Sequence, residues 1–315
     1  LLVGCGGGAS GSLGTVDAAP TPTSATTATE TTTADGGAGE EADGGATTAD
    51  GEAGSEAAAP GGTTVATAPA PVPAPPLAGN YVPSVVGQFP HDATVFTQGL
   101  EFFDGALLES GGGWNESSLR LFDYETGSDR WRLDLAEDDL FAEGVTVVEG
   151  SALQLTWQSR TLLVTDLTTT AATPAPPERR LEHYAGEGWG LCFDGDRLVM
   201  SDGSDRLTFR DAVTFEATGS VEVTLNGRPV ESINELECVG TQVVANVWQA
   251  DTIIVIDPAT GIVDATIDAS DLVPAGQVGS RSEVLNGIAY HQERGTFWLT
   301  GKRWPVLYEV ELIPA

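Results

Sequence analysis

Gln98-Gly99-Leu100-Glu101-Phe102 is a short, mostly apolar stretch that returns, with changes, four more times along the chain. The later copies are Glu143-Gly144-Val145-Thr146-Val147, Trp189-Gly190-Leu191-Cys192-Phe193, Asn234-Glu235-Leu236-Glu237-Cys238 and Asn286-Gly287-Ile288-Ala289-Tyr290. Their starts are 45, 46, 45 and 52 residues apart. A nearly fixed period of this length indicates a repeat architecture, in which each unit is one supersecondary element.

Each copy is followed by further apolar runs. A turn and a second run come first (ALLES, ALQLTW, RLVMSD, QVVANVW and TFWLTGKRW), and a third run ends in an Asp-led turn (LRLFDYETG, LLVTDLTTT, LTFRDAVTF and IIVIDPATG). Most runs are β-branched and aromatic, and no helical period persists for a dozen residues. Solenoid repeats of this length would be helical, whereas propeller blades have this size. The sequence therefore predicts an all-β fold, a five-bladed β-propeller.

The fifth unit has only three strands before the chain reaches Ala315. The run Val82–Phe89, just ahead of the first unit, can supply the missing outer strand, and this pairing would remove an open sheet edge. We expect a propeller over residues 80–315, with its ring closed by this N-terminal strand.

The segment before the propeller has a different composition. Residues 6–79 are almost entirely Ala, Thr, Gly, Pro, Ser, Asp and Glu, with no aromatic and no basic residue. Such a stretch cannot bury enough apolar area to offset the entropy of ordering it, so we predict a disordered linker.

Leu1-Leu2-Val3-Gly4-Cys5 is similar to the end of a bacterial lipoprotein signal, in which Cys5 would be lipidated. The alternative is a chance LLVGC. We predict an exported bacterial lipoprotein, held by this anchor on the periplasmic or extracellular face of a membrane. No other segment has the roughly 20 apolar residues of a transmembrane helix.

Acidic residues dominate the charge. The formal net charge is −32, and nine of the acids lie in the first 79 residues, which leaves −23 for the remainder. This balance argues against nucleic acid and anionic lipid as partners. We expect a monomer.

Cys192 and Cys238 lie on the first strands of neighbouring repeats, three and four residues after equivalent starts. Strand alternation would aim them at opposite faces, which favours two buried free thiols. The alternative is a disulfide between them, because disulfides are stable in exported proteins.

Equivalent positions of propeller repeats converge at one mouth of the central channel. The starting positions here are Gln98, Glu143, Trp189, Asn234 and Asn286, and the ends of the second runs add Glu109, Trp157, Asn246, Trp248, Lys302 and Trp304. Aromatic walls around amides, carboxylates and an ammonium describe a small polar-ligand pocket. Lys302 is the single Lys, which favours a site that needs a compact ammonium.

Structural alternatives exist for these residues. Glu143 could accept hydrogen bonds from channel backbone, the Trp residues could pack between blades, and Asn234 and Asn286 could cap strand ends. We predict no metal site, because the three His residues are scattered and Asp-Gly turns explain the acidic loops.

Several motifs in sequence order resemble the plant-type and bacterial glutaminyl cyclotransferases. They are FPHDATVFTQGLEF, FAEGVTVVEGSALQLTW, GEGWGL with LVMSDGSDRLTF, INELECV with VVANVWQADTIIVIDPATG, and VLNGIAY with TGKRWP. The resemblance spans Phe89 to about Val310 and touches every repeat. It implies a five-bladed propeller that cyclises the N-terminal glutamine of peptides to pyroglutamate, releases ammonia and uses no metal or other cofactor.

The resemblance also implies roles for individual residues. Glu143 would be the acid/base, and Lys302, Gln98 and Asn234 would orient the amide and stabilise the developing oxyanion. The aromatic cage would comprise Phe96, Phe141, Trp157, Trp189 and Trp248. Glu109 would be a second carboxylate at the substrate.

Two other functions compete with this one. A tethered propeller that binds a ligand without turnover would keep the pocket. A calcium-dependent lactonase-like propeller hydrolase would need several carboxylates and Asn at the channel centre, and a chelator would inhibit it.

Overall fold

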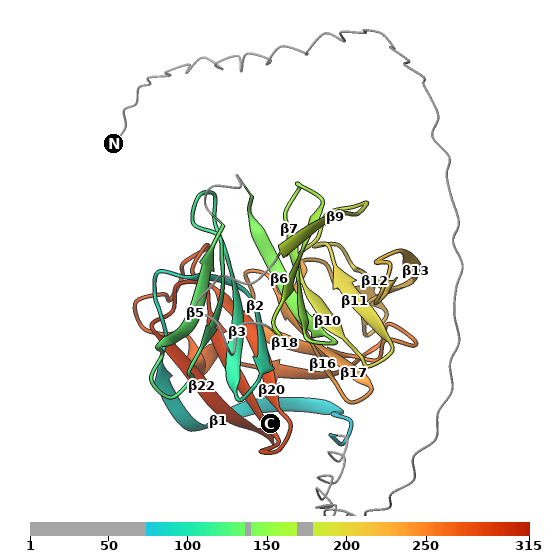
Figure 1. Cartoon of the computed structure of the whole chain (residues 1–315). Helices are drawn as coiled ribbons and strands as arrows, with labels where there is room; N and C mark the ends of the chain where they lie inside the picture. Colours follow the sequence, from blue (N-terminus) through green and yellow to red (C-terminus); the bar gives the residue numbers. More distant parts are fainter. Residues whose placement is uncertain (1–73, 136–139, 169–178) are drawn as a thin grey trace, which may run out of the picture. The chain divides into compact units, whose positions relative to one another are not determined.

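The computed structural model describes residues 74–135, 140–168 and 179–315, which belong to one compact unit, Ala66–Ala315. These residues form β-strands and one short 3-10 helix, η2 (Ser270–Leu272) (Figure 1). The all-β prediction is confirmed. Among the described residues, no helix is long and apolar enough to cross a membrane. The predicted lipidation site Cys5 and most of the predicted linker lie outside the described residues.

Three sheets have four antiparallel strands each, in sequence order. The first sheet comprises β2 (Phe96–Phe103), β3 (Ala106–Gly112), β4 (Ser118–Phe122) and β5 (Asp129–Asp134). The second comprises β6 (Ala142–Val148), β7 (Ser151–Thr156), β8 (Thr161–Asp166) and β9 (Arg179–His183). The third comprises β10 (Leu191–Phe193), β11 (Arg197–Ser201), β12 (Arg206–Asp211) and β13 (Ala217–Glu222).

The remaining strands form an eight-stranded sheet with two antiparallel halves, and a small hairpin. One half comprises β16 (Ile233–Val239), β17 (Gln242–Val247), β18 (Thr252–Ile256) and β19 (Val263–Asp268). The other comprises β20 (Leu285–His291), β21 (Thr296–Gly301), β22 (Val306–Pro314) and β1 (Gly79–Pro90). The hairpin comprises β14 (Thr224–Leu225) and β15 (Arg228–Pro229). The pairing thus gives five four-stranded sets, one for each predicted repeat, which we interpret as five blades.

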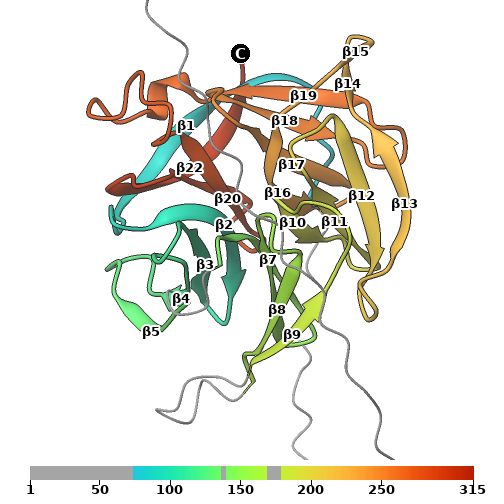
Figure 2. The same cartoon turned by 90° about the horizontal axis from the view of Figure 1, so that it is seen from above.

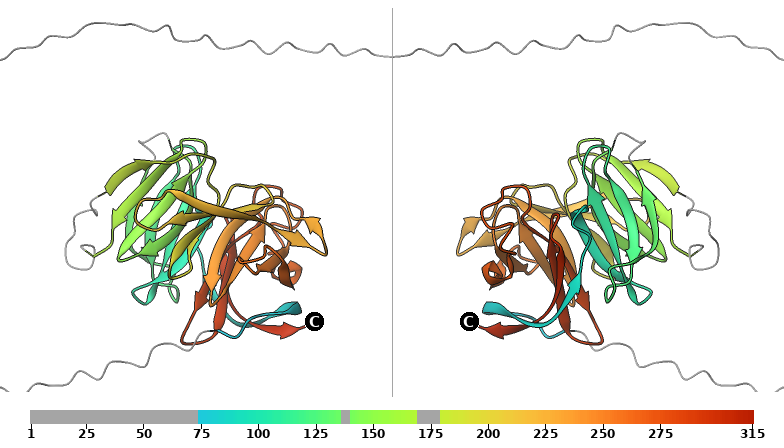
Figure 3. Two further views of the ribbon diagram at one scale, coloured as in Figure 1. Left: turned by 90° about the vertical axis from the view of Figure 1, so that its right-hand side faces the viewer. Right: turned by 90° about the vertical axis from the view of Figure 1, so that its left-hand side faces the viewer.

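Strand β1 completes the last set, as the sequence predicts. It pairs antiparallel with β22 from Tyr81 opposite Pro314 to Pro90 opposite Val306. Figure 3 shows this N-terminal strand in cyan beside the C-terminal strand in red. The start of β1, from Gly79 to Tyr81, pairs in parallel with Ala265 to Ile267 of β19, which joins the two halves of the large sheet. β22 therefore lies between β1 and β21 and is not an edge strand, which protects it against pairing with another chain.

The folded domain includes residues just ahead of the predicted boundary at residue 80. Leu77 donates its backbone N–H to the side-chain oxygen of Gln242 at 2.7 Å, and its side chain packs against the hydrophobic core. The last residues of the predicted linker therefore belong to the folded domain.

The first strand of each set lies toward the middle of the domain. In Figure 2, β2, β10, β16 and β20 surround the centre, and β5, β9 and β13 lie at the periphery. Glycine allows the inner strands to approach each other: a Cβ atom on Gly190 would lie 2.0 Å from the carbonyl oxygen of Asn234 on the next set. The backbone N–H of Gly144 donates to the carbonyl of Trp189 at 2.6 Å. The close approach of neighbouring inner strands explains why glycine follows the first residue in most copies of the repeat.

Apolar residues of the inner strands pack between neighbouring sheets. The third residue of every copy is buried, with at most 2% of its surface exposed: Leu100, Val145, Leu191, Leu236 and Ile288. Val145 packs with Leu108 and Leu119 of the first sheet. Burial of apolar side chains between sheets is the main favourable contribution to stability.

The predicted Asp-led turns are present after the third strands. Asp123 accepts the N–H of Thr126 at 2.9 Å, and Asp211 accepts that of Thr214 at 2.8 Å. These hydrogen bonds lower the pKa values of both carboxyl groups. The side chains thereby fix the turns that lead to the outermost strands.

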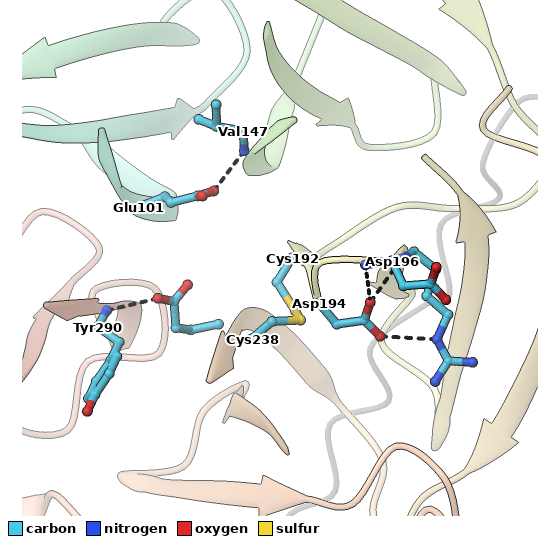
Figure 4. The surroundings of a disulfide bond; sticks show 9 residues. Glu101, Val147, Cys192, Asp194, Asp196, Cys238 and Tyr290 are labelled. Carbon is cyan, nitrogen blue, oxygen red and sulfur yellow. Dashed lines mark hydrogen bonds and ion pairs between the residues drawn. A yellow bond between two sulfur atoms is a disulfide. The ribbon is translucent and has the colours of Figure 1, made fainter. Parts of the chain in front are cut away.

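The prediction of two free thiols is wrong, because Cys192 and Cys238 form a disulfide (Figure 4). Their Cα atoms are 5.4 Å apart, on β10 and β16. The two side chains do point to opposite faces of their own sheets. Neighbouring sets, however, contact each other through opposite faces, so strand alternation brings the two thiols together in one core cluster.

Candidate active site

A cavity of about 360 Å³ lies where all five sets meet. It is lined by nine residues, all of which the sequence predicts: Phe96, Gln98, Phe141, Glu143, Trp157, Trp189, Asn234, Trp248 and Lys302. Each comes from the start of a first strand or from the residues that follow a second strand. These two places lie at the same end of an antiparallel pair, so the repeat itself brings the residues together.

Lys302 follows β21 and reaches across to the first set. Its ammonium donates a hydrogen bond to Oε1 of Gln98 at 2.5 Å and lies 4.7 Å from the centre of the Phe96 ring. Only 3% of Lys302 is exposed. A buried ammonium needs such partners, and the hydrogen bond in turn fixes the orientation of the Gln98 amide.

Glu143 and Lys302 are the ionisable residues among those nine, and the cavity perturbs both. Burial raises the pKa of Glu143 well above its usual value, against the opposing charge of Lys302 and with the help of Glu187. Burial lowers the pKa of Lys302 to about 8, against the charges of Glu143 and Glu235. An acid with a raised pKa near a cation with a lowered one is the arrangement expected of a proton-transfer site.

The aromatic side chains form two groups around these charges. Phe141 lies edge-on to Phe96, with ring centres 6.1 Å apart, and to Trp157, at 5.7 Å. Trp189 and Trp248 are perpendicular to each other at 5.8 Å. Such walls exclude water and present ring faces that attract an amine.

Asn234 supplies a free hydrogen-bond acceptor. Only 2% of its surface is exposed, and its Oδ1 has no hydrogen-bond partner among the described residues. A buried acceptor without a partner is costly, so a ligand N–H is the natural partner in the cavity.

The other polar residues of the predicted mouth each form a hydrogen bond within the domain, although Oδ1 of Asn286 and Nδ2 of Asn246 have no partner among the described residues. Asn286 donates to the carbonyl of Thr97 at 2.9 Å, and Asn246 accepts the N–H of Gly287 at 3.0 Å. Trp304 donates its indole N–H to the carbonyl of Glu283 at 2.9 Å. These residues hold the inner strands beneath the cavity without lining it.

A family model described as glutamine cyclotransferase matches residues 58–312. This chain belongs to the glutamine cyclotransferase family. A glutaminyl-peptide cyclotransferase of Arabidopsis thaliana is 36% identical over 233 residues, which cover 72% of this chain and 70% of that protein. The crystal structure of a glutaminyl cyclase from Myxococcus xanthus matches with a TM-score of 0.67 and 41% identity, over 74% of this chain and 97% of that one. The resemblance inferred from the motifs is confirmed.

Glu109 does not join the candidate site of this cyclotransferase. It is fully buried, and its carboxylate accepts hydrogen bonds from Thr97 at 2.7 Å, from Arg120 at 2.7 Å and from His91 at 3.0 Å. Burial alone would raise the pKa of Glu109, but Arg120 and His91 outweigh it and lower the pKa. Because β3 places this side chain in the sheet rather than at its end, the assignment to the substrate has no support from its position.

Two residues next to the site were missed in the sequence. Glu187 accepts hydrogen bonds from the indoles of Trp157 and Trp189. Trp114 lies 5.8 Å from Phe141 and 6.3 Å from Trp157, ring centre to ring centre, and 46% of it is exposed. The repeat does indicate Trp114, because this residue follows the second strand of its set, β3, much as Trp157 follows β7.

Metal-ligating side chains do not converge in the described part of this cyclotransferase: no group of three His, Cys, Asp or Glu residues there is arranged to hold an ion. The chemistry that the cavity offers with its own residues is proton transfer by Glu143, charge stabilisation by Lys302, and orientation by amides and aromatic rings.

Proposed function

We propose that this chain is a glutaminyl-peptide cyclotransferase, which converts the N-terminal glutamine of peptides to pyroglutamate and releases ammonia. The observation that carries the proposal is the meeting of nine predicted residues from all five sets around one cavity, with a buried carboxyl and a buried ammonium among them. Family membership and both similar proteins support the same activity.

The reaction needs one group that both accepts and donates a proton, and we assign this role to Glu143. The α-amine nitrogen of the substrate bonds to its own γ-carboxamide carbon while the Glu143 carboxylate accepts the proton that the amine loses. The bond between that carbon and the amide nitrogen then breaks. Glu143 returns the proton to the departing nitrogen, which leaves as ammonia. A raised pKa suits both steps near neutral pH.

The remaining residues position the substrate and stabilise the intermediate. The side chain of glutamine must fold back on the amine, and the aromatic wall favours this compact shape. The Lys302 ammonium stabilises the oxyanion that forms on the carboxamide oxygen. The unpartnered Oδ1 of Asn234 accepts a hydrogen bond from a substrate N–H, and the fixed amide of Gln98 provides a further contact.

We further propose a metal-independent, monomeric enzyme that is exported and anchored by a lipid on Cys5. The observations that support the anchor and export are the sequence LLVGC and the long spacer without aromatic residues that follows it. Partition of the full-length protein into detergent, compared with a Cys5→Ser variant in the same bacterial host, tests the anchor. Equal partition of the two proteins would contradict it.

A mass-spectrometric time course of a Gln-initiated peptide with the full chain tests the activity. We expect loss of one ammonia from the peptide, no loss above the spontaneous rate with Glu143→Gln, and no effect of a chelator. A folded protein that binds the peptide without ammonia release would instead indicate a binding module, and inhibition by the chelator would contradict metal independence.

A further inference from the structure

Glu187 connects two walls of the cavity without lining it. Its Oε1 accepts hydrogen bonds from Nε1 of Trp157 and, at 3.3 Å, from Nε1 of Trp189. Trp157 follows β7 in the second set, and Trp189 precedes β10 in the third. One carboxylate oxygen therefore sets the orientation of two indoles that belong to different sheets.

The backbone around Glu187 is held firmly. Tyr184 donates its hydroxyl to the carbonyl of Thr156, at the end of β7, at 2.8 Å. Gly188 packs against the same hydroxyl, because a Cβ atom there would lie 2.5 Å from it. The N–H of Trp189 donates to Ser201 at 3.0 Å. The backbone that carries Glu187 is thus anchored on both sides along the chain.

Both indole N–H groups turn toward Glu187, so the rings present carbon surfaces to the cavity. Without this acceptor, each N–H would need a new partner, and a rotated indole would change the shape of the cavity. Glu187 also places a negative charge near Glu143. The other ionisable groups that act on or with Glu143 are Lys302, from the last set, and Tyr184, from the end of the second.

We propose that Glu187 is a positioning residue for the cyclotransferase reaction: it orients Trp157 and Trp189 and holds a negative charge beside the acid/base Glu143. This inference rests on the proposed function for its kinetic consequences but not for the orientation of the indoles. The charge of Glu187 helps burial to raise the pKa of Glu143, so its removal lowers that pKa.

Two variants separate the two effects. Glu187→Gln keeps an oxygen acceptor and removes the charge, whereas Glu187→Ala removes both. Glu182→Gln is the matched control, because Glu182 lies on β9 and forms an ion pair with the exposed Arg180. Near-ultraviolet circular dichroism and acrylamide quenching of Trp fluorescence, without substrate, report on the indoles. We expect both signals to change in Glu187→Ala and to stay unchanged in Glu182→Gln.

Kinetics on a Gln-initiated peptide test the effects of Glu187 on KM and on the titration of Glu143. For Glu187→Ala we expect KM to rise about tenfold, the effect of losing a charged hydrogen bond, with a smaller change in kcat. For Glu187→Gln we expect the acidic limb of kcat/KM to move to lower pH by about half a unit. The substrate amine titrates equally in every protein, so the difference between variants belongs to the enzyme.

Unchanged spectra in Glu187→Ala, or an acidic limb in Glu187→Gln that stays or moves to higher pH, would overturn the proposal. A wild-type protein without ammonia release would refute the proposed function instead. In that case the spectra of the substrate-free variants still decide whether Glu187 orients the two indoles.

Discussion

Lys302 donates a hydrogen bond to Oε1 of Gln98 at 2.5 Å and so joins the last sheet to the first at the cavity. A cation held this rigidly costs no reorganisation when negative charge develops on a bound substrate. We expect Lys302→Met to lower kcat about 100-fold, the usual effect of removing one such group. Ammonia release by a coupled assay measures the loss, and thermal denaturation shows that the variant is folded. An unchanged kcat would exclude Lys302 from the reaction.

The pH profile of Lys302→Arg gives a second prediction. Burial lowers the pKa of Lys302 to about 8, so the wild-type enzyme loses this positive charge, and activity with it, as the pH rises through 8. Arginine keeps its charge throughout this range. We expect a lower maximal rate, since the planar guanidinium fits the site poorly, and an alkaline limb moved to higher pH. An alkaline limb that coincides with that of the wild type would assign the titration to another group.

Most residues of this site can be predicted from the sequence, and the reason is physical. Repeats of nearly equal length place equivalent residues at equivalent heights, so Glu143, Trp189 and Asn234 had to meet once the repeat was recognised. A direct comparison of second strands would also have placed Trp114 beside Trp157. The period thus predicts which residues converge, because it describes the geometry within each unit.

Contacts between units are harder to predict from the same period. The disulfide depends on which faces of two sheets meet, and strand alternation within one sheet does not contain that information. The position of Glu109 depends on two buried partners: Arg120 lies opposite it on β4 of the same sheet, and His91 comes from the segment that follows β1. Glu187 lies before β10, outside the strands that the repeat defines. These residues were misjudged or missed because their partners are set by packing between elements.

The disulfide between Cys192 and Cys238 should stabilise the fold without affecting catalysis. It closes a separation of 46 residues and joins two inner strands, and neither cysteine lines the cavity. We expect Cys192→Ser/Cys238→Ser to lower the free energy of unfolding by about 3 kcal/mol, with kcat unchanged at moderate temperature. Urea denaturation measures the difference. In a Cys5→Ser variant, which keeps only this pair, no thiol should react with a thiol reagent in denaturant until a reductant is added, and immediate reaction would contradict the bond.

Glu109 should be critical for stability rather than activity. Its pKa in the folded protein lies below the unfolded value, so its contribution is present above about pH 4.5 and is lost as the pH falls below it. Glu109→Gln leaves the buried Arg120 and His91 without their anion, which costs about 3–5 kcal/mol. We expect a loss of this size at pH 7 and a smaller one at pH 3, both measured by urea denaturation. Equal losses at the two pH values would show that the charge is not responsible.

Glu101 and Glu237, which line a second cavity of about 450 Å³, give the opposite dependence on pH. Burial raises the pKa of Glu101 to about 7, although hydrogen bonds from Thr146 and Val147 oppose the shift, and it raises the pKa of Glu237 as well. A raised pKa in the folded state means that stability is full below the unfolded value and falls as the pH rises toward 7.

Glu101→Gln cannot ionise and keeps an oxygen that accepts the N–H of Val147, which Glu101 contacts at 2.9 Å. We therefore expect the Tm of the wild type to fall from pH 5 to pH 8, and that of Glu101→Gln to fall less, with Glu182→Gln as the control that follows the wild type. Differential scanning calorimetry over this range measures all three. Parallel curves for the wild type and Glu101→Gln would show that Glu101 stays ionised in the folded protein and that the second cavity tolerates its charge.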